Sequence, residues 1–147
     1  GFCPPAEAIV FTRFVNPAEE DYELLKFAPA IFQTYVPGNS LRVTVVGDEV
    51  FSARVLTTEE DAQVDWRRQY FNPLEKQDHT FQKHEIIEFC KSLNILYGAL
   101  DFQMNGQDLF FLECNSGGQF LFVEIQTEQP ICKAFARLLT NTTKIRS

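Results

Sequence analysis

The sequence predicts a single α+β unit over residues 1–147, with a mostly antiparallel sheet and helices packed on one side. Short β-branched runs separated by tight turn signals predict hairpins. Amphipathic stretches with apolar residues three and four positions apart predict helices. A composition of 45% hydrophobic and 22% charged residues fits one globular domain with a substantial core.

The amino-terminal part combines strand-like and helix-like stretches. Residues 8–12 are apolar and strand-like. Asn16 and Pro17 then fit the cap and the first position of a helix, which should end before Pro29. Residues 30–36 return to strand character before a turn rich in Pro and Gly.

Two hairpins are predicted in the middle of the chain. Residues 41–46 and 49–55 are β-branched runs around a Gly-Asp turn, and residues 97–104 and 109–114 flank an Asn-Gly turn signal. The apolar residues of the second hairpin are too continuous for a sheet with a water-exposed face. We therefore expect a helix to cover this hairpin.

Two helices are predicted beside the hairpins, and a polar loop over residues 57–69 precedes them. In the stretch 78–93, helical spacing relates Ile86, Phe89, Cys90 and Leu93. In the last segment, Pro130 precedes four residues at the same spacing, namely Ile131, Phe135, Leu138 and Leu139. Each helix should therefore place one apolar face on the core.

Charge and composition exclude several classes of function. A net charge of -7 argues against a nucleic-acid partner, which requires a basic surface. No apolar run reaches the roughly 20 residues of a membrane span. The four cysteines lack metal-binding spacing, so we expect buried free thiols and a cytoplasmic location. The two histidines are not expected to be catalytic, and the sequence does not predict the oligomeric state.

The most informative polar residues are Asp101, Glu113 and Asn115, which lie on two adjacent, largely apolar strands. A charged group in a core is costly unless it is paired or bound to a cation, and Glu113 has apolar neighbours on both sides. Carboxylate and amide oxygens are the ligands that Mg²⁺ prefers, and it leaves other positions for water and phosphates. These residues are therefore candidate Mg²⁺ ligands.

This metal site requires a particular strand register in the second hairpin. Glu113 and Asn115 are two residues apart and share a strand face. A strict two-residue Asn-Gly turn would set Asp101 opposite Phe110 and point it away from Glu113. A three-residue loop or a bulge would set Asp101 against Phe111 and bring the three oxygens to one side. Spacing alone fits equally well two surface acids beside an asparagine that starts a turn.

A family resemblance favours the metal site. Residues 98–101, Gly-Ala-Leu-Asp, and residues 111–120, Phe-Leu-Glu-Cys-Asn-Ser-Gly-Gly-Gln-Phe, resemble the signature that ends ATP-grasp enzymes. The likeness is closest to ribosomal-protein glutamyl ligases and graspetide (microviridin-type) macrocyclases. In that family an acid, a Glu and an Asn hold magnesium ions between the ATP phosphates. The resemblance implies these roles for Asp101, Glu113 and Asn115.

The resemblance extends roughly from residue 8 to residue 139. Phe-Gln-Thr-Tyr-Val-Pro, residues 32–37, looks like the hinge strand whose backbone reads adenine, which implies nucleotide contacts at Gln33, Tyr35 and Val36. Many relatives carry Glu where this chain has Thr34, so a side-chain contact is not carried over to that position.

Two arginines match further landmarks of the family. Arg42 lies in Leu-Arg-Val-Thr-Val-Val-Gly, residues 41–47, and Arg67 lies in Asp-Trp-Arg, residues 65–67. The resemblance implies that both contact ATP phosphates or an acyl phosphate. The alternatives are a surface salt bridge for Arg42 and a solvated side chain for Arg67.

The resemblance implies an ATP-dependent carboxylate-amine or carboxylate-hydroxyl ligase that forms an acyl phosphate. ATP and Mg²⁺ would be its cofactors, and a carboxylate-bearing peptide or protein its substrate. The sequence shows neither the family's amino-terminal domain nor the lysine-bearing first part of its nucleotide clamp. We therefore expect the carboxy-terminal part of a longer protein. The alternative is a non-catalytic nucleotide- or peptide-binding module with the same fold.

Overall fold

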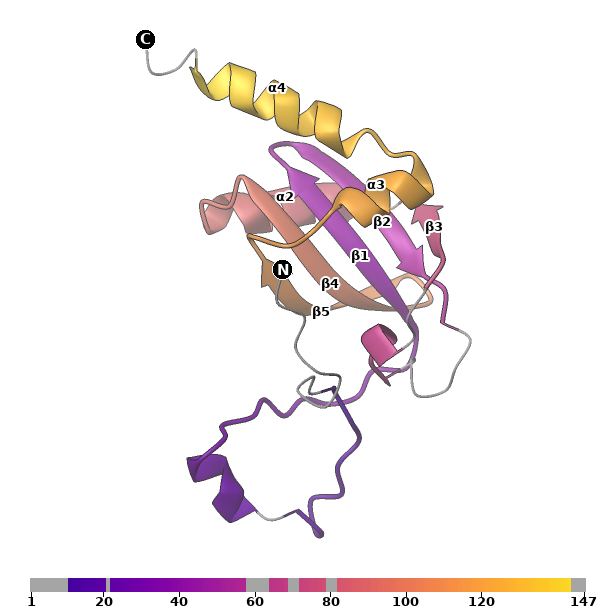
Figure 1. The fold of residues 1–147 in the computed structure, drawn as a ribbon, viewed down its shortest axis with the longest axis vertical. Helices are drawn as coiled ribbons and strands as arrows, with labels where there is room; N and C mark the ends of the chain where they lie inside the picture. The colour runs from indigo at the N-terminus through magenta and orange to yellow at the C-terminus, as the bar shows by residue number, and fades with distance from the viewer. Residues whose placement is uncertain (1–10, 21, 58–63, 69–71, 79–81, 144–147) are drawn as a thin grey trace, which may run out of the picture.

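Five antiparallel strands form one sheet in the described part of the chain, in the order β3-β2-β1-β4-β5 (Figure 1). This computed structural model describes residues 11–20, 22–57, 64–68, 72–78 and 82–143. The strands are β1 (Asn39–Val46), β2 (Glu49–Val55), β3 (Leu74–Gln77), β4 (Tyr97–Asn105) and β5 (Asp108–Asn115). The helices are α2 (Lys83–Ser92), α3 (Leu121–Thr127) and α4 (Ile131–Thr143), with short 3-10 helices at Tyr22–Lys26 and Trp66–Arg68.

Both predicted hairpins are present, and left-handed glycines make their turns. β1 and β2 pair around a turn in which Gly47 has φ 60°. In the second hairpin Asn105 pairs with Asp108, so the two turn residues are Gly106, with φ 62°, and Gln107. The turn lies one residue later than the predicted Asn-Gly turn, because glycine takes the first left-handed position.

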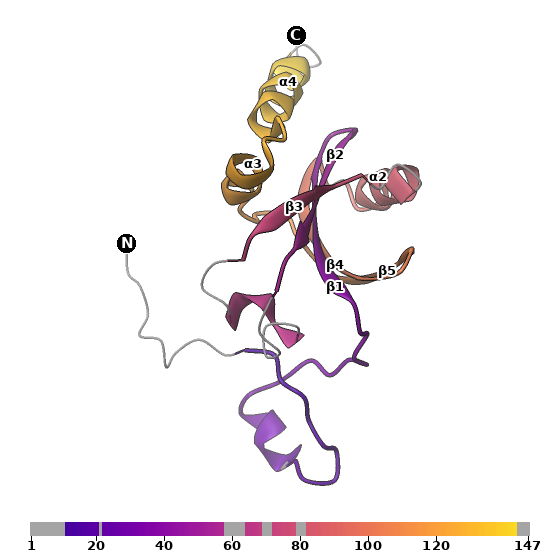
Figure 2. The same cartoon turned by 90° about the vertical axis from the view of Figure 1, so that its right-hand side faces the viewer.

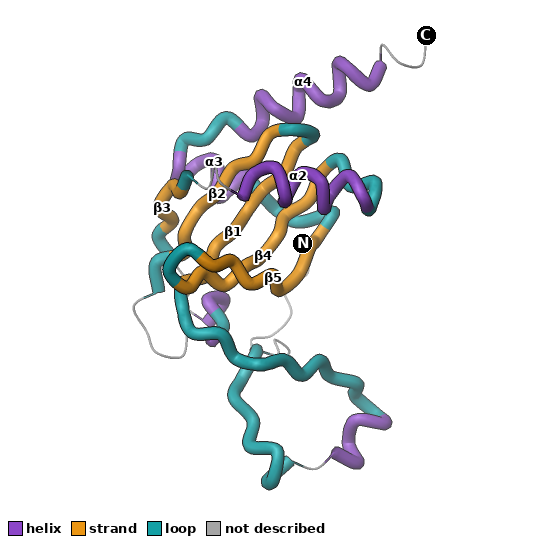
Figure 3. The backbone as a smooth tube through the Cα atoms, turned by 180° about the vertical axis from the view of Figure 1, so that it is seen from behind, coloured by secondary structure: helices purple, strands orange, loops and turns teal. Residues whose placement is uncertain are grey.

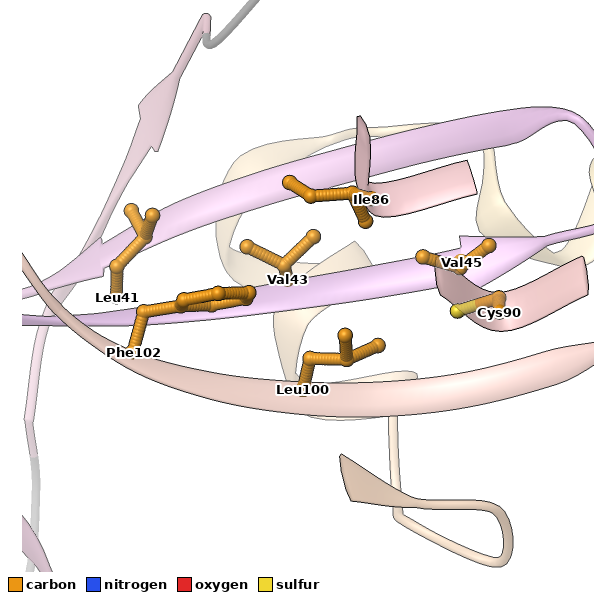
Figure 4. Packing of buried hydrophobic residues seen from close by; sticks show 7 residues of the cluster. All are labelled: Leu41, Val43, Val45, Ile86, Cys90, Leu100 and Phe102. Carbon is orange, nitrogen blue, oxygen red and sulfur yellow. The ribbon is translucent and has the colours of Figure 1, made fainter. Parts of the chain in front are cut away.

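One face of the sheet packs against α2 and is wholly apolar at its centre (Figure 4). Alternate residues of the two central strands point toward the helix, as the strand period of two requires. The cluster comprises Leu41, Val43 and Val45 of β1, Leu100 and Phe102 of β4, and Ile86 and Cys90 of α2. The helix is the one predicted over residues 78–93, although it begins at Lys83.

The opposite face is covered by α3 and α4 at one end only. There Val46, Phe51 and Ala53 pack against three helix residues, Val123, Ile131 and Ala134. Figure 2 shows α2 on one side of the sheet and α3 with α4 on the other. The α+β class and the antiparallel sheet are thus confirmed, while the helices lie on both faces. Sheet face that α3 and α4 leave uncovered remains available for a site.

Residues 11–20 and 22–37 run outside the sheet, mostly as loop (Figure 3). The helix predicted from Asn16 is reduced to the 3-10 helix Tyr22–Lys26. Residues 30–36 are not a strand, which corrects the prediction, because they pair with no strand of the described sheet. Most of their apolar side chains are exposed, and Ile31 is 93% exposed. Residues 8–10 of the first predicted strand lie outside the described residues.

The cysteines differ in environment. Cys90 is buried, as predicted, and Cys114 is half-buried, but Cys132 is exposed on α4, so the prediction of buried thiols is wrong for Cys132. Cys3 lies outside the described residues. Among the helices that the structure describes, none has the length and apolarity to cross a bilayer.

Candidate functional site

A row of paired residues crosses the sheet on the face opposite α2. In this row Arg42 lies between Ala53 of β2 and Asp101 of β4, and Asp101 lies opposite Glu113 of β5. Directly opposed residues on neighbouring strands point to the same face. The fold therefore brings one arginine and two carboxylates from three strands together.

A β-bulge in the second hairpin produces this alignment. Phe102 pairs with Phe111, whereas the next pair is Asp101 with Glu113, so Leu112 is an extra residue on β5. A bulge shifts the register by one residue and so reverses which side chains share a face. The predicted bulge is present, but the predicted pairing of Asp101 with Phe111 is wrong because the bulge lies after Phe111.

Asp101 is the most constrained carboxylate of the row. Its side chain is 17% exposed, and its Oδ2 accepts a hydrogen bond of 2.7 Å from Nη1 of Arg42. Burial raises the pKa of Asp101 above its ordinary value, the charge and hydrogen bond of Arg42 oppose the rise, and the adjacent carboxyl of Glu113 adds to it. Two carboxylates this close repel each other unless a proton or a cation lies between them.

The three predicted metal ligands offer the oxygen donors that suit a divalent cation, and they share one face of the sheet. Asn115 shares the face of Glu113, and its Oδ1 accepts the backbone N–H of Gly117 at 2.9 Å, which leaves that oxygen a second lone pair. Among the described residues no group of three His, Cys, Asp or Glu side chains is placed to hold a metal, and the amide of Asn115 is the other predicted oxygen donor. A two-acid, one-amide set suits Mg²⁺, which takes few protein ligands.

Glu113 and Asn115 are exposed, which corrects the expectation of a buried acidic hairpin. β5 is an edge strand of the sheet, and most of its residues are exposed although Phe111 contacts Phe89 of α2. Phe111 and Leu112 are also exposed, at 49% and 36%. The second hairpin is therefore covered only in part, and the acids face a space that a ligand can enter.

Arg42 is a buried residue of the site rather than a surface cation. Only 8% of it is exposed, so the alternative of a surface salt bridge is wrong. Besides Asp101, it donates from Nη2 to the backbone oxygen of Gln119 at 3.3 Å. Its charge thus neutralises Asp101 and holds the loop after β5 against the sheet.

Arg67 is oriented by Asp65, an acid that the sequence reading had not assigned a role. The side chain of Asp65, 3% exposed, accepts from Nε and Nη2 of Arg67 at 2.8 and 2.6 Å, and from the backbone N–H of Thr12 at 2.9 Å. Burial alone would raise the pKa of Asp65, but these hydrogen bonds hold it below its ordinary value. The acid two residues before the arginine was the available sequence signal.

The charge of Arg67 also interacts with the two carboxylates of the row. The hydrogen bonds that Arg67 donates to Asp65 raise the pKa of Arg67, and attraction from Glu113 and Asp101 adds to the rise. The Arg67 side chain remains 55% exposed. A guanidinium held in place yet open to solvent suits a phosphate or carboxylate ligand.

A cleft of about 340 Å³ joins these groups. Its lining includes Gln33, Trp66, Arg67, Asp101, Gln103 and Glu113. Four predicted site residues thus line one cleft, Arg42 contacts the lining residue Asp101, and Asn115 lies two residues after the lining residue Glu113. Tyr35 and Val36 are not part of the lining, and Tyr35 packs edge-on against Phe14 with ring centroids 4.8 Å apart. The volume lies within the range of small-molecule sites.

The glycine loop after β5 packs directly on the sheet. A Cβ added at Gly118 would lie 2.5 Å from Cβ of Ala99 and 3.1 Å from Nη2 of Arg42. The hydroxyl of Tyr97 donates to the backbone oxygen of Gly118. Gly118 therefore permits a close backbone approach, and the partners are Ala99 and Arg42.

Comparison with known proteins places this fold. No protein-family model and no curated protein matches the chain. A RiPP-associated ATP-grasp ligase of Chryseobacterium gregarium, solved with ADP, a leader and a core peptide, matches with TM-score 0.80 and 27% identity over 90% of this chain and 43% of that chain. The macrocyclase MdnC of Microcystis aeruginosa MRC, bound with precursor peptide MdnA, matches with TM-score 0.72 and 31% identity over 91% and 44%.

More distant structures share the fold. The ATP-grasp ligase PsnB, solved with a phosphomimetic variant of its minimal precursor, Mg and ADP, has TM-score 0.60 and 19% identity over 74% of this chain and 34% of that chain. The fold of this chain thus resembles part of the ATP-grasp ligases. Within that superfamily the chain resembles the graspetide macrocyclases. It spans less than half the length of these structures.

Proposed function

We propose that residues 1–147 form the carboxy-terminal part of an ATP-dependent ligase that joins a carboxylate to an amine or hydroxyl on a peptide or protein. One observation carries the proposal: Asp101 and Glu113 face each other on an open cleft that also holds the oriented guanidinium of Arg67. The likeness to ATP-grasp peptide ligases supports the reaction class. Free thiols at Cys90 and Cys114 suit a cytoplasmic enzyme.

The metal ligands would be Asp101, Glu113 and Asn115. When bound there, Mg²⁺ would neutralise charge on the terminal phosphates of ATP. The 2.7 Å ion pair with Arg42 favours the ionised form of Asp101 and so opposes the effect of burial, and a bound cation would favour that form further. Gln33 in the cleft and the backbone at Tyr35 and Val36 would contact the adenine.

The reaction would proceed in two displacements. A substrate carboxylate oxygen attacks the γ-phosphorus, the bond to the β–γ bridging oxygen breaks, and ADP leaves with that electron pair. The amine nitrogen or hydroxyl oxygen then attacks the acyl carbon, inorganic phosphate leaves, and the nucleophile's proton is lost. Arg67 would bind the negative oxygens that develop in both steps, while Asp65 fixes its orientation.

Nucleotide turnover tests this proposal. We would measure ADP release in the presence of a carboxylate-bearing peptide, using the longest version of the protein that contains this chain. Glu113→Gln should lower the rate by about 100- to 1,000-fold, because it removes a charged group that acts on the phosphates. Asp108→Asn changes an exposed acid at the turn of the same hairpin and should have no such effect. An unaltered rate in Glu113→Gln would contradict the metal role.

A second candidate is a nucleotide- or peptide-binding module without turnover. The observation in its favour is the cleft itself, whose volume of about 340 Å³ and polar lining suit a bound ligand whether or not a reaction follows. Such a module would bind Mg²⁺-ATP with an affinity that depends on Glu113, yet release no ADP. Binding without turnover in the longest version of the protein would therefore favour this alternative.

A further inference from the structure

Gln103 is a buried polar residue of the cleft that neither the family motifs nor the site above explains. It lies on β4 two residues after Asp101 and on the same face, opposite Ser40 of β1. Only 7% of it is exposed, and both Gln103 and Ser40 line the cleft. Its carboxamide therefore faces the space that would hold a ligand.

The carboxamide oxygen of Gln103 has no hydrogen-bond partner among the described residues. Of the polar side chains that line the cleft, Gln103 alone has such a buried, unpartnered atom in the described part of the chain. A buried amide oxygen without a partner costs free energy that an apolar atom in its place would not. An unpaired oxygen at the wall of a cleft can accept a hydrogen bond from a bound ligand.

The position of Gln103 indicates which part of a ligand it meets. Two residues along a strand span about 7 Å, so its Cα lies that far from Asp101 and from the proposed phosphate end. The chain enters β1 at this end of the cleft, immediately after the segment that contains Gln33. A nucleotide with its phosphates at Asp101 and Glu113 would extend its nucleoside toward Gln103.

We propose that the Gln103 carboxamide hydrogen-bonds the nucleoside of the bound nucleotide, at a ribose hydroxyl or a polar group of the base. This inference rests on the proposed function, since it assumes that phosphates bind at the acidic end of the cleft. Gln103 is then a residue that distinguishes a nucleotide from a bare polyphosphate. Its carboxamide oxygen is unpaired without ligand, so the hydrogen bond that forms with the nucleoside adds to the binding free energy.

The test compares two ligands in the longest version of the protein that contains this chain. Dissociation constants for Mg²⁺-ATP and Mg²⁺-tripolyphosphate are measured by calorimetry for the wild type and Gln103→Met, which keeps the length and removes the polar atoms. Gln82→Met is the matched control, because Gln82 also has a buried, unpartnered amide oxygen within the described residues but is not among those that line the cleft. Gln103→Asn, shorter by one methylene, gives a second variant that retains the amide.

Gln103→Met should weaken ATP binding by about 3- to 10-fold, since one neutral hydrogen bond is lost, and should leave tripolyphosphate binding unchanged. The melting temperature without nucleotide should be equal to or above that of the wild type, which a purely structural role for Gln103 would not give. Gln103→Asn should lie between the two, and Gln82→Met should bind both ligands normally.

Two outcomes would overturn the inference alone. Unchanged ATP affinity in Gln103→Met and Gln103→Asn would mean that the amide does not contact the nucleoside, and equal weakening for both ligands would place its effect at the phosphate end. If the wild type binds neither ligand, the proposed function itself fails and the inference with it.

Discussion

Strands β1 and β4 present core residues on one face of the sheet and site residues on the other. Toward α2, the strands present Leu41, Val43 and Leu100, all fully buried among other apolar groups. Toward the cleft, they present Arg42 and Asp101, a buried arginine and a half-buried acid joined by an ion pair. Because side chains alternate along a strand, each functional residue is flanked by core residues that fix its backbone.

The comparison teaches that burial by itself does not identify the core of this protein. Arg42 at 8% and Gln103 at 7% are as buried as Phe102 at 8%. The difference lies in what surrounds them, since the α2 face is closed by a helix and the cleft face stays partly open. We therefore expect substitutions on the α2 face to change stability alone and those on the cleft face to change charge-dependent properties.

The largest expected effect is on the α2 face. Leu100→Ala removes a fully buried side chain and should lower the free energy of unfolding by about 2–5 kcal/mol, because a cavity remains. Leu121→Ala, at a leucine that is 55% exposed on α3, should cost less than about 0.5 kcal/mol. Unfolding in guanidinium chloride measures both free energies. Equal losses in the two variants would contradict the distinction between the closed core under α2 and the more open opposite face.

An intermediate effect is expected at Asp65, on the cleft side. Asp65→Asn should lower the free energy of unfolding by about 1.5–3 kcal/mol at neutral pH, because charged hydrogen bonds to Arg67 and Thr12 are weakened. The pKa of Asp65 is lowered in the folded state, so the wild type's advantage is fully present above the ordinary aspartate pKa of about 3.9.

The same advantage should disappear as the pH falls through the lowered pKa of Asp65, where the folded protein finally takes up the proton. Unfolding curves at neutral and acidic pH check this dependence. The cost of Leu100→Ala provides the control, since no charge of its own is removed. A pH-independent cost for Asp65→Asn would contradict the electrostatic account of the cleft side.

The smallest of these effects is expected at Gly118. Gly118→Ala should cost about 1–3 kcal/mol, because its Cβ would lie 2.5 Å from that of Ala99 and must displace backbone. Gly117→Ala is a matched control, since its Cβ would make only an ordinary contact, 3.7 Å from Oδ1 of Asn115. Thermal unfolding of the two variants would separate them, and similar melting temperatures would show that the loop does not pack closely on the sheet.

The local signals of the sequence predicted most of the sheet and two helices. The β-branched runs located both hairpins, and the spacing of Ile86 and Cys90 located α2. β3 was missed because Leu74–Gln77 is a short, mostly polar edge strand. The short α3 was also missed, and residues 30–36 look like a strand although they find no partner in the described sheet.

For the site, the sequence could name residues but not their register. Residue type and family resemblance pointed to Asp101 and Glu113, whereas the extra residue Leu112, which aligns them, depends on how two strands pair. The roles of Asp65 and Gln103 depend on contacts between segments distant in sequence. Such contacts have no local pattern, so only the fold identifies them.

The most direct test of the metal site is a measurement of cation binding. Mn²⁺, as a spectroscopic substitute for Mg²⁺, would be titrated by electron paramagnetic resonance in the presence of ATP, using the wild type, Asp101→Asn, Glu113→Gln and the hairpin control Asp108→Asn. The site as described predicts that Asp101→Asn and Glu113→Gln each weaken Mn²⁺ binding at least about 10-fold while Asp108→Asn does not. Unchanged Mn²⁺ affinity in both site variants would contradict the central claim that these paired carboxylates hold the cation.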